Sequence, residues 1–142
     1  MKLTRGKRIA LELLGPPLLG VIVLMAISYA QTLWIALQDW KTPKLEPGLL
    51  KPLGLLIVAY LFAGIPSVIY TFVMEWSFAK GLDPESGRTM QLSAYLGTMA
   101  GISIGLLIGA FHFDSTFWLM GGIGLIVGFL MGLLIRHGST EK

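Results

Sequence analysis

Residues 97–132 read GTMAGISIGLLIGAFHFDSTFWLMGGIGLIVGFLMG, and glycine recurs in this stretch at every fourth position. Four of these glycines lie in one apolar run and three in the next: Gly97, Gly101, Gly105 and Gly109, then Gly124, Gly128 and Gly132. Residues four apart lie on nearly the same face of an α-helix, so each run presents a groove without side chains where another helix can come close. The pattern predicts two glycine zippers on membrane-spanning helices.

The composition supports a membrane protein. Of the 142 residues, 54% are hydrophobic and only 13% are charged, whereas charged residues make up roughly a quarter of a typical soluble domain. The charged residues are also absent from four long runs, residues 13–38, 52–74, 89–113 and 115–135. Each run exceeds the roughly 20 residues that cross the hydrocarbon core as a helix. We therefore expect one all-α membrane domain with four spans, at about residues 16–37, 53–75, 90–111 and 116–135.

The basic residues predict the orientation. With the N-terminus in the cytoplasm, eight lysines and arginines lie on the inner side and three on the outer side, as the positive-inside rule requires. Both termini are then cytoplasmic, and we expect the membrane to be a bacterial cytoplasmic (inner) membrane. The net charge of +3 follows from this topology. Because the basic residues form no stripe with interleaved aromatics, a nucleic-acid partner is not indicated.

The last two spans are separated by a short turn, residues 112–115, and should form an antiparallel hairpin. A turn centred there places Gly97 level with Gly132, Gly101 with Gly128, and Gly105 with Gly124. The simplest use of the two grooves is that these helices pack on each other. Two alternatives remain open, a groove that receives a helix of another copy or another protein, and a groove that lines a pore.

Two prolines complicate the first span. Gly15-Pro16-Pro17 interrupts its apolar run, and proline suits the first turn of a helix better than its interior. We therefore expect a short interfacial segment at residues 3–14, a spanning helix from about Pro16, and Glu12 at the level of the lipid headgroups. Signal-peptide cleavage after Ala30 is disfavoured, because apolar sequence resumes at Leu33.

The second span contains Gly64-Ile65-Pro66 near its middle, where proline predicts a kink. Such a break opens a ligand site in some transporters, although most kinked helices are structural. Glu75, at the inner end of this span, is the best single candidate for a functional side chain. Its expected position is the membrane interface. We therefore keep Gly64, Pro66 and Glu75 as candidate functional residues.

Groups of residues typical of enzymes are missing. The two histidines, His112 and His137, fall on opposite sides of the membrane and cannot share a metal ion. Cysteine is absent, and the serines within the spans have no candidate base at their depth. We expect no catalysis, no metal and no cofactor.

Two hypotheses about function remain. The first is a non-enzymatic accessory protein that regulates or stabilises another membrane protein. The second is an oligomeric transporter or channel for a small solute or ion. Small multidrug transporters have the same number of helices and use an acidic residue in the first span, but Glu12 precedes the double proline and the likeness is architectural only. The expected partners are the lipid bilayer and either another membrane protein or further copies of this chain.

Overall fold

The computed structural model describes residues 4–39, 50–109 and 115–140. These residues form four α-helices: α1 (Arg5–Asp39), α2 (Leu50–Ala79), α3 (Gly87–Ile108) and α4 (Ser115–Thr140). Each helix is long and apolar enough to cross a membrane, and the described residues contain no strand. The expected all-helical protein with four helices able to span a membrane is confirmed.

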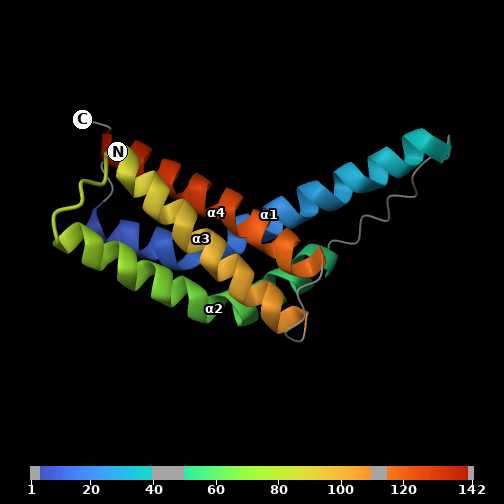
Figure 1. Cartoon of the computed structure of the whole chain (residues 1–142), viewed down its shortest axis with the longest axis horizontal. Helices are drawn as coiled ribbons and strands as arrows, with labels where there is room; N and C mark the ends of the chain where they lie inside the picture. The colour runs from blue at the N-terminus through green and yellow to red at the C-terminus, as the bar shows by residue number, and fades with distance from the viewer. Residues whose placement is uncertain (1–3, 40–49, 110–114, 141–142) are drawn as a thin grey trace.

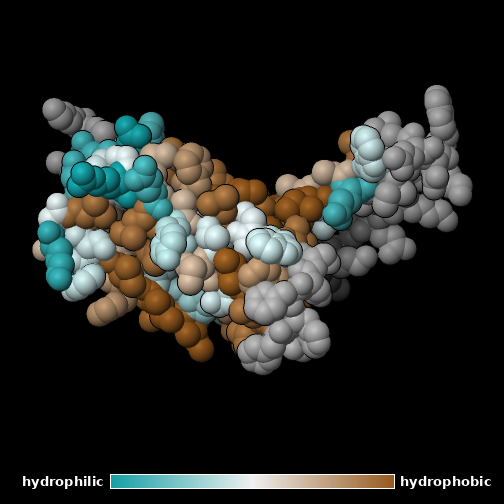
Figure 2. All heavy atoms as spheres, in the orientation of Figure 1, coloured by the Kyte–Doolittle hydropathy of each residue, from teal (hydrophilic) through white to brown (hydrophobic). Residues whose placement is uncertain are grey.

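The helices form a bundle in which each one packs against the next along the chain and α4 returns to pack against α1. Both ends of the described chain and the turn between α2 and α3 lie at the same end of the bundle (Figure 1). We call this end the basic end, after the side chains that it carries: Arg5, Lys7, Arg8, Lys80, Arg88 and Arg136. Figure 2 shows hydrophilic residues gathered there and hydrophobic residues over the middle of the bundle.

The helix α1 is continuous through Pro16 and Pro17. We expected the residues before these prolines to form a separate interfacial segment. That expectation is wrong, because the helix already begins at Arg5. Two adjacent prolines remove only two helical N–H donors, those for the carbonyls of Glu12 and Leu13. The first half of α1 is also held by packing: a Cβ added to the buried Gly15 would lie 2.6 Å from Sδ of Met131 in α4.

Beyond its first half, α1 diverges from the other helices (Figure 1). Tyr29, Leu33 and Trp34 in this second half are more than half exposed. The bundle proper is therefore closed by four helices near the basic end and is more open toward the other end.

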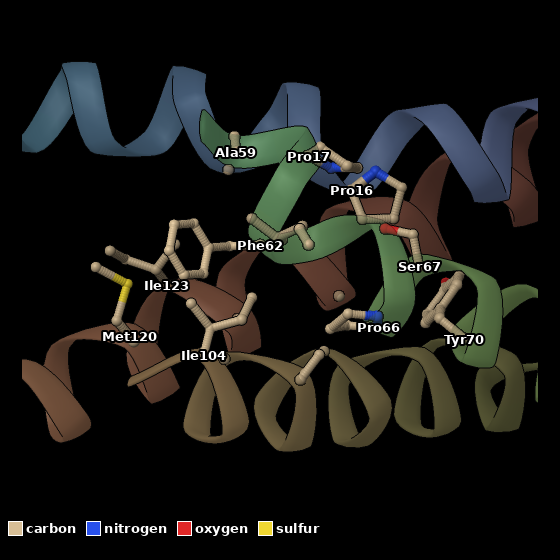
Figure 3. A pocket seen from close by; sticks show the side chains of 18 of the residues that line it. Pro16, Pro17, Ala59, Phe62, Pro66, Ser67, Tyr70, Ile104, Met120 and Ile123 are labelled. Atoms are coloured by element: carbon tan, nitrogen blue, oxygen red, sulfur yellow. The ribbon is translucent and has the colours of Figure 1, made fainter. Parts of the chain in front are cut away.

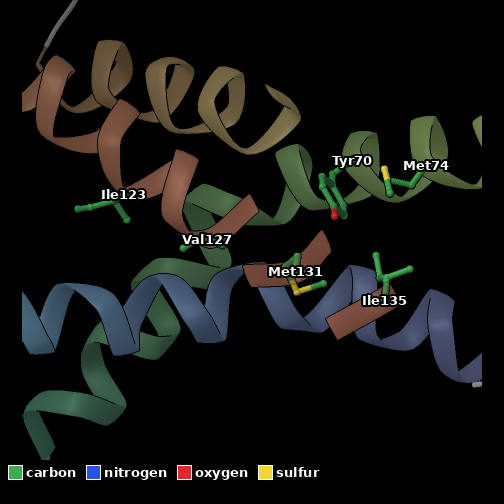
Figure 4. Packing of buried hydrophobic residues seen from close by; sticks show 6 residues of the cluster. All are labelled: Tyr70, Met74, Ile123, Val127, Met131 and Ile135. Carbon is green, nitrogen blue, oxygen red and sulfur yellow. The ribbon is translucent and has the colours of Figure 1, made fainter. Parts of the chain in front are cut away.

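The core contains six buried residues, two from α2 and four from α4 (Figure 4): Tyr70, Met74, Ile123, Val127, Met131 and Ile135. Leucines and other apolar residues of α1 and α3 pack against this cluster. The helix α4 thus contributes most of the core. In a membrane the packing is stabilised by van der Waals contact, since lipid tails are as apolar as the side chains themselves.

The closest helix contact joins α3 and α4. Every fourth residue of α3 is buried: Thr89, Ser93, Gly97, Gly101 and Gly105. A Cβ added to Gly97 would overlap the carbonyl oxygen of Gly124 and lie 2.7 Å from Cα of Gly128. These distances leave no room for any side chain, so the two backbones touch directly.

The register of this contact differs from the predicted one. Gly97 lies between Gly124 and Gly128, and Gly132 instead faces Met90 and Ser93 of α3. The predicted level pairing of Gly97 with Gly132 is therefore wrong, and so are the two pairings that follow from it. In the observed, staggered arrangement each glycine enters the gap between two residues of the facing helix, which brings the axes closer than opposed Cα atoms would allow.

A short hydrogen-bonded chain adds polar contacts to this packing. The hydroxyls of Tyr70 in α2 and Ser93 in α3 lie 2.5 Å apart, and the Ser93 hydroxyl also donates to the carbonyl of Gly128 in α4. Three helices are thereby connected at one buried point. Such interhelical bonds contribute on the order of 1 kcal/mol each in membrane proteins.

We predict that Gly101→Ala lowers the free energy of unfolding by about 1–3 kcal/mol, because the new methyl group would overlap the carbonyl oxygen of Met120. Gly122→Ala is the matched control, since Gly122 in α4 is exposed and has no atom within 4 Å of the added carbon. Unfolding of both variants in mixed micelles would be followed by circular dichroism. Equal stability of the two variants would contradict the observed contact.

Candidate functional site

Four charged side chains meet at the basic end, where the start of α1 lies beside the end of α2. The Nε atom of Arg8 donates to Oε1 of Glu75 at 2.8 Å, and Nε of Arg5 donates to Oε2 of the same carboxylate at 3.3 Å. Glu12, one helical turn after Arg8, has its Oε1 3.9 Å from Nε of Arg8. One guanidinium therefore lies between two carboxylates.

Burial differs sharply within this cluster. The side chain of Arg5 is 79% exposed, those of Arg8 and Glu75 are 16% and 14% exposed, and that of Glu12 is fully buried. The guanidinium of Arg8 also lies over the ring of Phe78, with its central carbon 4.4 Å from the ring centroid. Arg8 is thus held on several sides, whereas Arg5 is largely in solvent.

Glu12 is the unusual member of the cluster. Neither of its carboxylate oxygens has a hydrogen-bond partner among the described residues. The continuous α1 places Glu12 in the bundle interior, and its expected depth at the level of the headgroups stays a prediction. An ionisable group buried without hydrogen bonds is costly, and in a membrane protein it marks a candidate functional site.

Glu75, singled out from the sequence, does lie in this cluster, and α2 places it one turn before its own end. Its neighbour Trp76 faces the other way, with its ring under the ammonium of Lys80 at 4.0 Å. The burial of Glu12 escaped the sequence reasoning, which began the first spanning helix at the double proline. The signal that could have found it is the spacing of Arg8 and Glu12, four residues apart and hence on one helix face.

Gly64 and Pro66 do not join the charged cluster. The ribbon of α2 bends along its length (Figures 1 and 4), and Pro66 lies in the wall of a cavity in the bundle together with Pro16, Pro17 and Ser67 (Figure 3). A Cβ added to Gly64 would meet no atom within 4 Å, so no close contact requires glycine there. Of the two residues, only Pro66 belongs to a site.

The cavity lies between all four helices and has a volume of about 170 Å³. Its lining is almost entirely apolar, and the polar side chains in it are Ser67 and Tyr70. The Tyr70 hydroxyl is bonded to Ser93, whereas the buried Ser67 hydroxyl has no hydrogen-bond partner among the described residues. The molecule therefore has two distinct interior features, a charged cluster at the basic end and an apolar cavity farther in.

The turn between α2 and α3 is closed by local hydrogen bonds. The carbonyl of Asp83 accepts bonds from the hydroxyls of Ser86 and Thr89, and the Asp83 carboxylate accepts the N–H of Glu85. The helix α3 begins at Gly87, with Ser86 in the N-cap position. Ser86 makes no side-chain bond to the backbone of α3, and its hydroxyl instead helps to close the turn onto the carbonyl of Asp83.

Among the described residues no group of three His, Asp or Glu side chains could hold a metal ion. His112 lies outside the described residues, so the comparison with His137 stays a prediction.

No model of a known protein family matches the chain, and no curated protein or solved structure matches it either. The function has to be argued from the two interior features themselves.

We predict that Arg8→Gln lowers the free energy of unfolding by about 3 kcal/mol, because it leaves the carboxylates of Glu12 and Glu75 inside the protein without their shared cation. Adding Glu12→Gln to this variant should recover a large part of the loss, since the buried carboxyl group that lost its cation is then replaced by an amide. The measurement is unfolding in mixed micelles, as a double-mutant cycle.

The control is Arg5→Gln, which removes an arginine that contacts the same glutamate from an exposed position and should cost at most about 1 kcal/mol. Strictly additive effects of Arg8→Gln and Glu12→Gln would show that the two side chains do not interact.

Proposed function

We propose that the protein is a non-enzymatic accessory protein that binds another membrane protein and stabilises or regulates it. The observation that supports this most is the apolar interior of the bundle. The core consists of large apolar side chains, and the buried Tyr70 and Ser93 are already bonded to each other across two helices. A path for ions or polar solutes needs polar groups that replace their hydration shell, and the interior of one protomer offers few such groups. The outer surface of the bundle is then where the protein acts.

The proposal places the protein in a bacterial cytoplasmic membrane with both termini in the cytoplasm. The distribution of charge supports this orientation, because the two chain ends and the α2–α3 turn share the basic end (Figure 1). The glycine rows act in this account as zippers that make α3 and α4 one stiff unit. Since Gly97, Gly101, Gly105, Gly124, Gly128 and Gly132 all lie in that contact, a partner would bind to other faces of the bundle.

The test is purification of the chain from its native host in a mild detergent, with the tag placed after residue 142. We expect an integral membrane protein to copurify in a fixed ratio, and its abundance or activity to change when the gene for this chain is deleted. A strain that carries the tag alone is the control. Purification of this chain with no other protein, together with an unaltered membrane proteome in the deletion strain, would contradict the proposal.

A second candidate function is an oligomeric transporter or channel, and one observation favours it. The buried carboxylate of Glu12 has no hydrogen-bond partner within the described part of the chain, and a structural protein has little use for such a group. In a transporter it would bind a proton or a small cation that enters from the basic end, past Arg8 and Glu75. Further copies of the chain would have to supply the rest of the path.

This candidate predicts flux of protons, sodium or potassium in proteoliposomes under an imposed gradient. Glu12→Gln should abolish that flux, because the amide cannot carry the charge. Glu85→Gln, which changes an exposed carboxylate in the α2–α3 turn, should leave it unchanged. Absence of flux under every gradient would rule out the transport of these ions.

A further inference from the structure

The apolar cavity draws its wall from every helix (Figure 3). The helix α1 contributes Pro16 and Pro17, and α2 contributes Phe62 and Pro66. The floor is formed where α3 and α4 meet, by glycines of both helices: Gly97, Gly101, Gly124 and Gly128. The cavity therefore lies over the closest helix contact in the molecule.

Its origin follows from that contact. Glycine lets α3 and α4 touch, but it supplies no side chain to fill the centre of the bundle. The facing walls hold small residues as well, including Gly20, Ala59, Ala63 and Ala100. Atoms that line an unfilled space lose van der Waals contacts, so an occupant of matching chemistry would be stabilised there.

The cavity reaches the surface of the bundle. Three of its wall residues, Val58, Phe62 and Ile108, are 48%, 44% and 48% exposed. All three lie in helices long and apolar enough to span the membrane, and α1 leaves the bundle toward this end (Figure 1). At this depth the medium outside the opening is the hydrocarbon of the bilayer and not water.

We propose that the cavity binds an acyl chain of a membrane lipid. Its lining disfavours water, because a water molecule needs two to four polar partners. Among the described residues of the lining, the polar side chains are Tyr70, which is already bonded to Ser93, and Ser67, which has no partner. Its volume of about 170 Å³ exceeds the ~150 Å³ of an engineered apolar cavity that stays dry and takes up benzene. A flexible hydrocarbon chain is as apolar as this lining, and the bilayer presents such chains in excess at the opening. The site is independent of the accessory function proposed above.

The test uses the full chain in nanodiscs of a phosphatidylcholine that carries a photoreactive diazirine in the middle of one acyl chain. After illumination and digestion, mass spectrometry locates the labelled residues. Lipid-facing residues such as Ile65 and Phe72, 74% and 71% exposed, will be labelled in any case. We expect label also on Ile123 and Val127, which line the cavity and are each only 6% exposed. An acyl chain reaches these two residues only from inside.

A cavity-filling variant supplies the matched comparison. Ala63→Leu combined with Ala100→Leu adds bulk to two walls and should remove the label from Ile123 and Val127 while leaving Ile65 and Phe72 labelled. The control is Ala26→Leu with Ala79→Leu, the same change at two exposed alanines, which should keep the interior label.

The result that would overturn the proposal is wild-type protein labelled on its outer residues alone, and this outcome does not depend on whether the variant folds. Interior label that persists in a folded cavity-filling variant would also overturn it. Circular dichroism in the same nanodiscs establishes the folding of each variant.

Discussion

The structure depends on one constraint, the direct contact of the α3 and α4 backbones. At Gly97 and Gly101 the facing backbone leaves no space for even a methyl group. This contact makes α4 the centre of the molecule, since α4 packs against α3 on one side and presents most of the core residues on another. It also leaves the middle of the bundle short of side chains, and the apolar cavity lies there. The close packing of α3 against α4 and the incomplete filling of the middle of the bundle therefore have the same cause.

The charged cluster at the basic end depends on a different interaction, the pairing of charged side chains. Arg8 lies between Glu75, which accepts a hydrogen bond from it at 2.8 Å, and the fully buried Glu12, whose nearest oxygen is 3.9 Å away. Glu75 can be explained as the residue that attaches the end of α2 to the start of α1. Glu12 cannot be explained in this way, because its contact with Arg8 is long and its oxygens accept no hydrogen bond from residues 4–39, 50–109 or 115–140. The two proposed functions differ most in the role that they assign to Glu12.

The sequence predicted the four helices and the small residues between the last two, because long uncharged runs and a spacing of four have direct physical meanings. It did not predict the register, since two glycine rows with the same spacing can slide past each other by one helical turn and still match. The stagger of Gly97 between Gly124 and Gly128 arises from three-dimensional packing. The burial of Glu12 was missed for a similar reason. Whether α1 continues through Pro16 and Pro17 depends on tertiary contacts such as that of Gly15 with Met131, which no local rule contains.

The measurement that tests the central contact most directly is magic-angle-spinning NMR of the ¹³C-labelled protein in lipid bilayers, recording through-space contacts between glycine Cα atoms. The account predicts cross-peaks that join Gly97 to Gly124 and to Gly128, and Gly101 to Gly124. A cross-peak from Gly97 to Gly132 without these, or the absence of any contact between the glycines of α3 and α4, would contradict it.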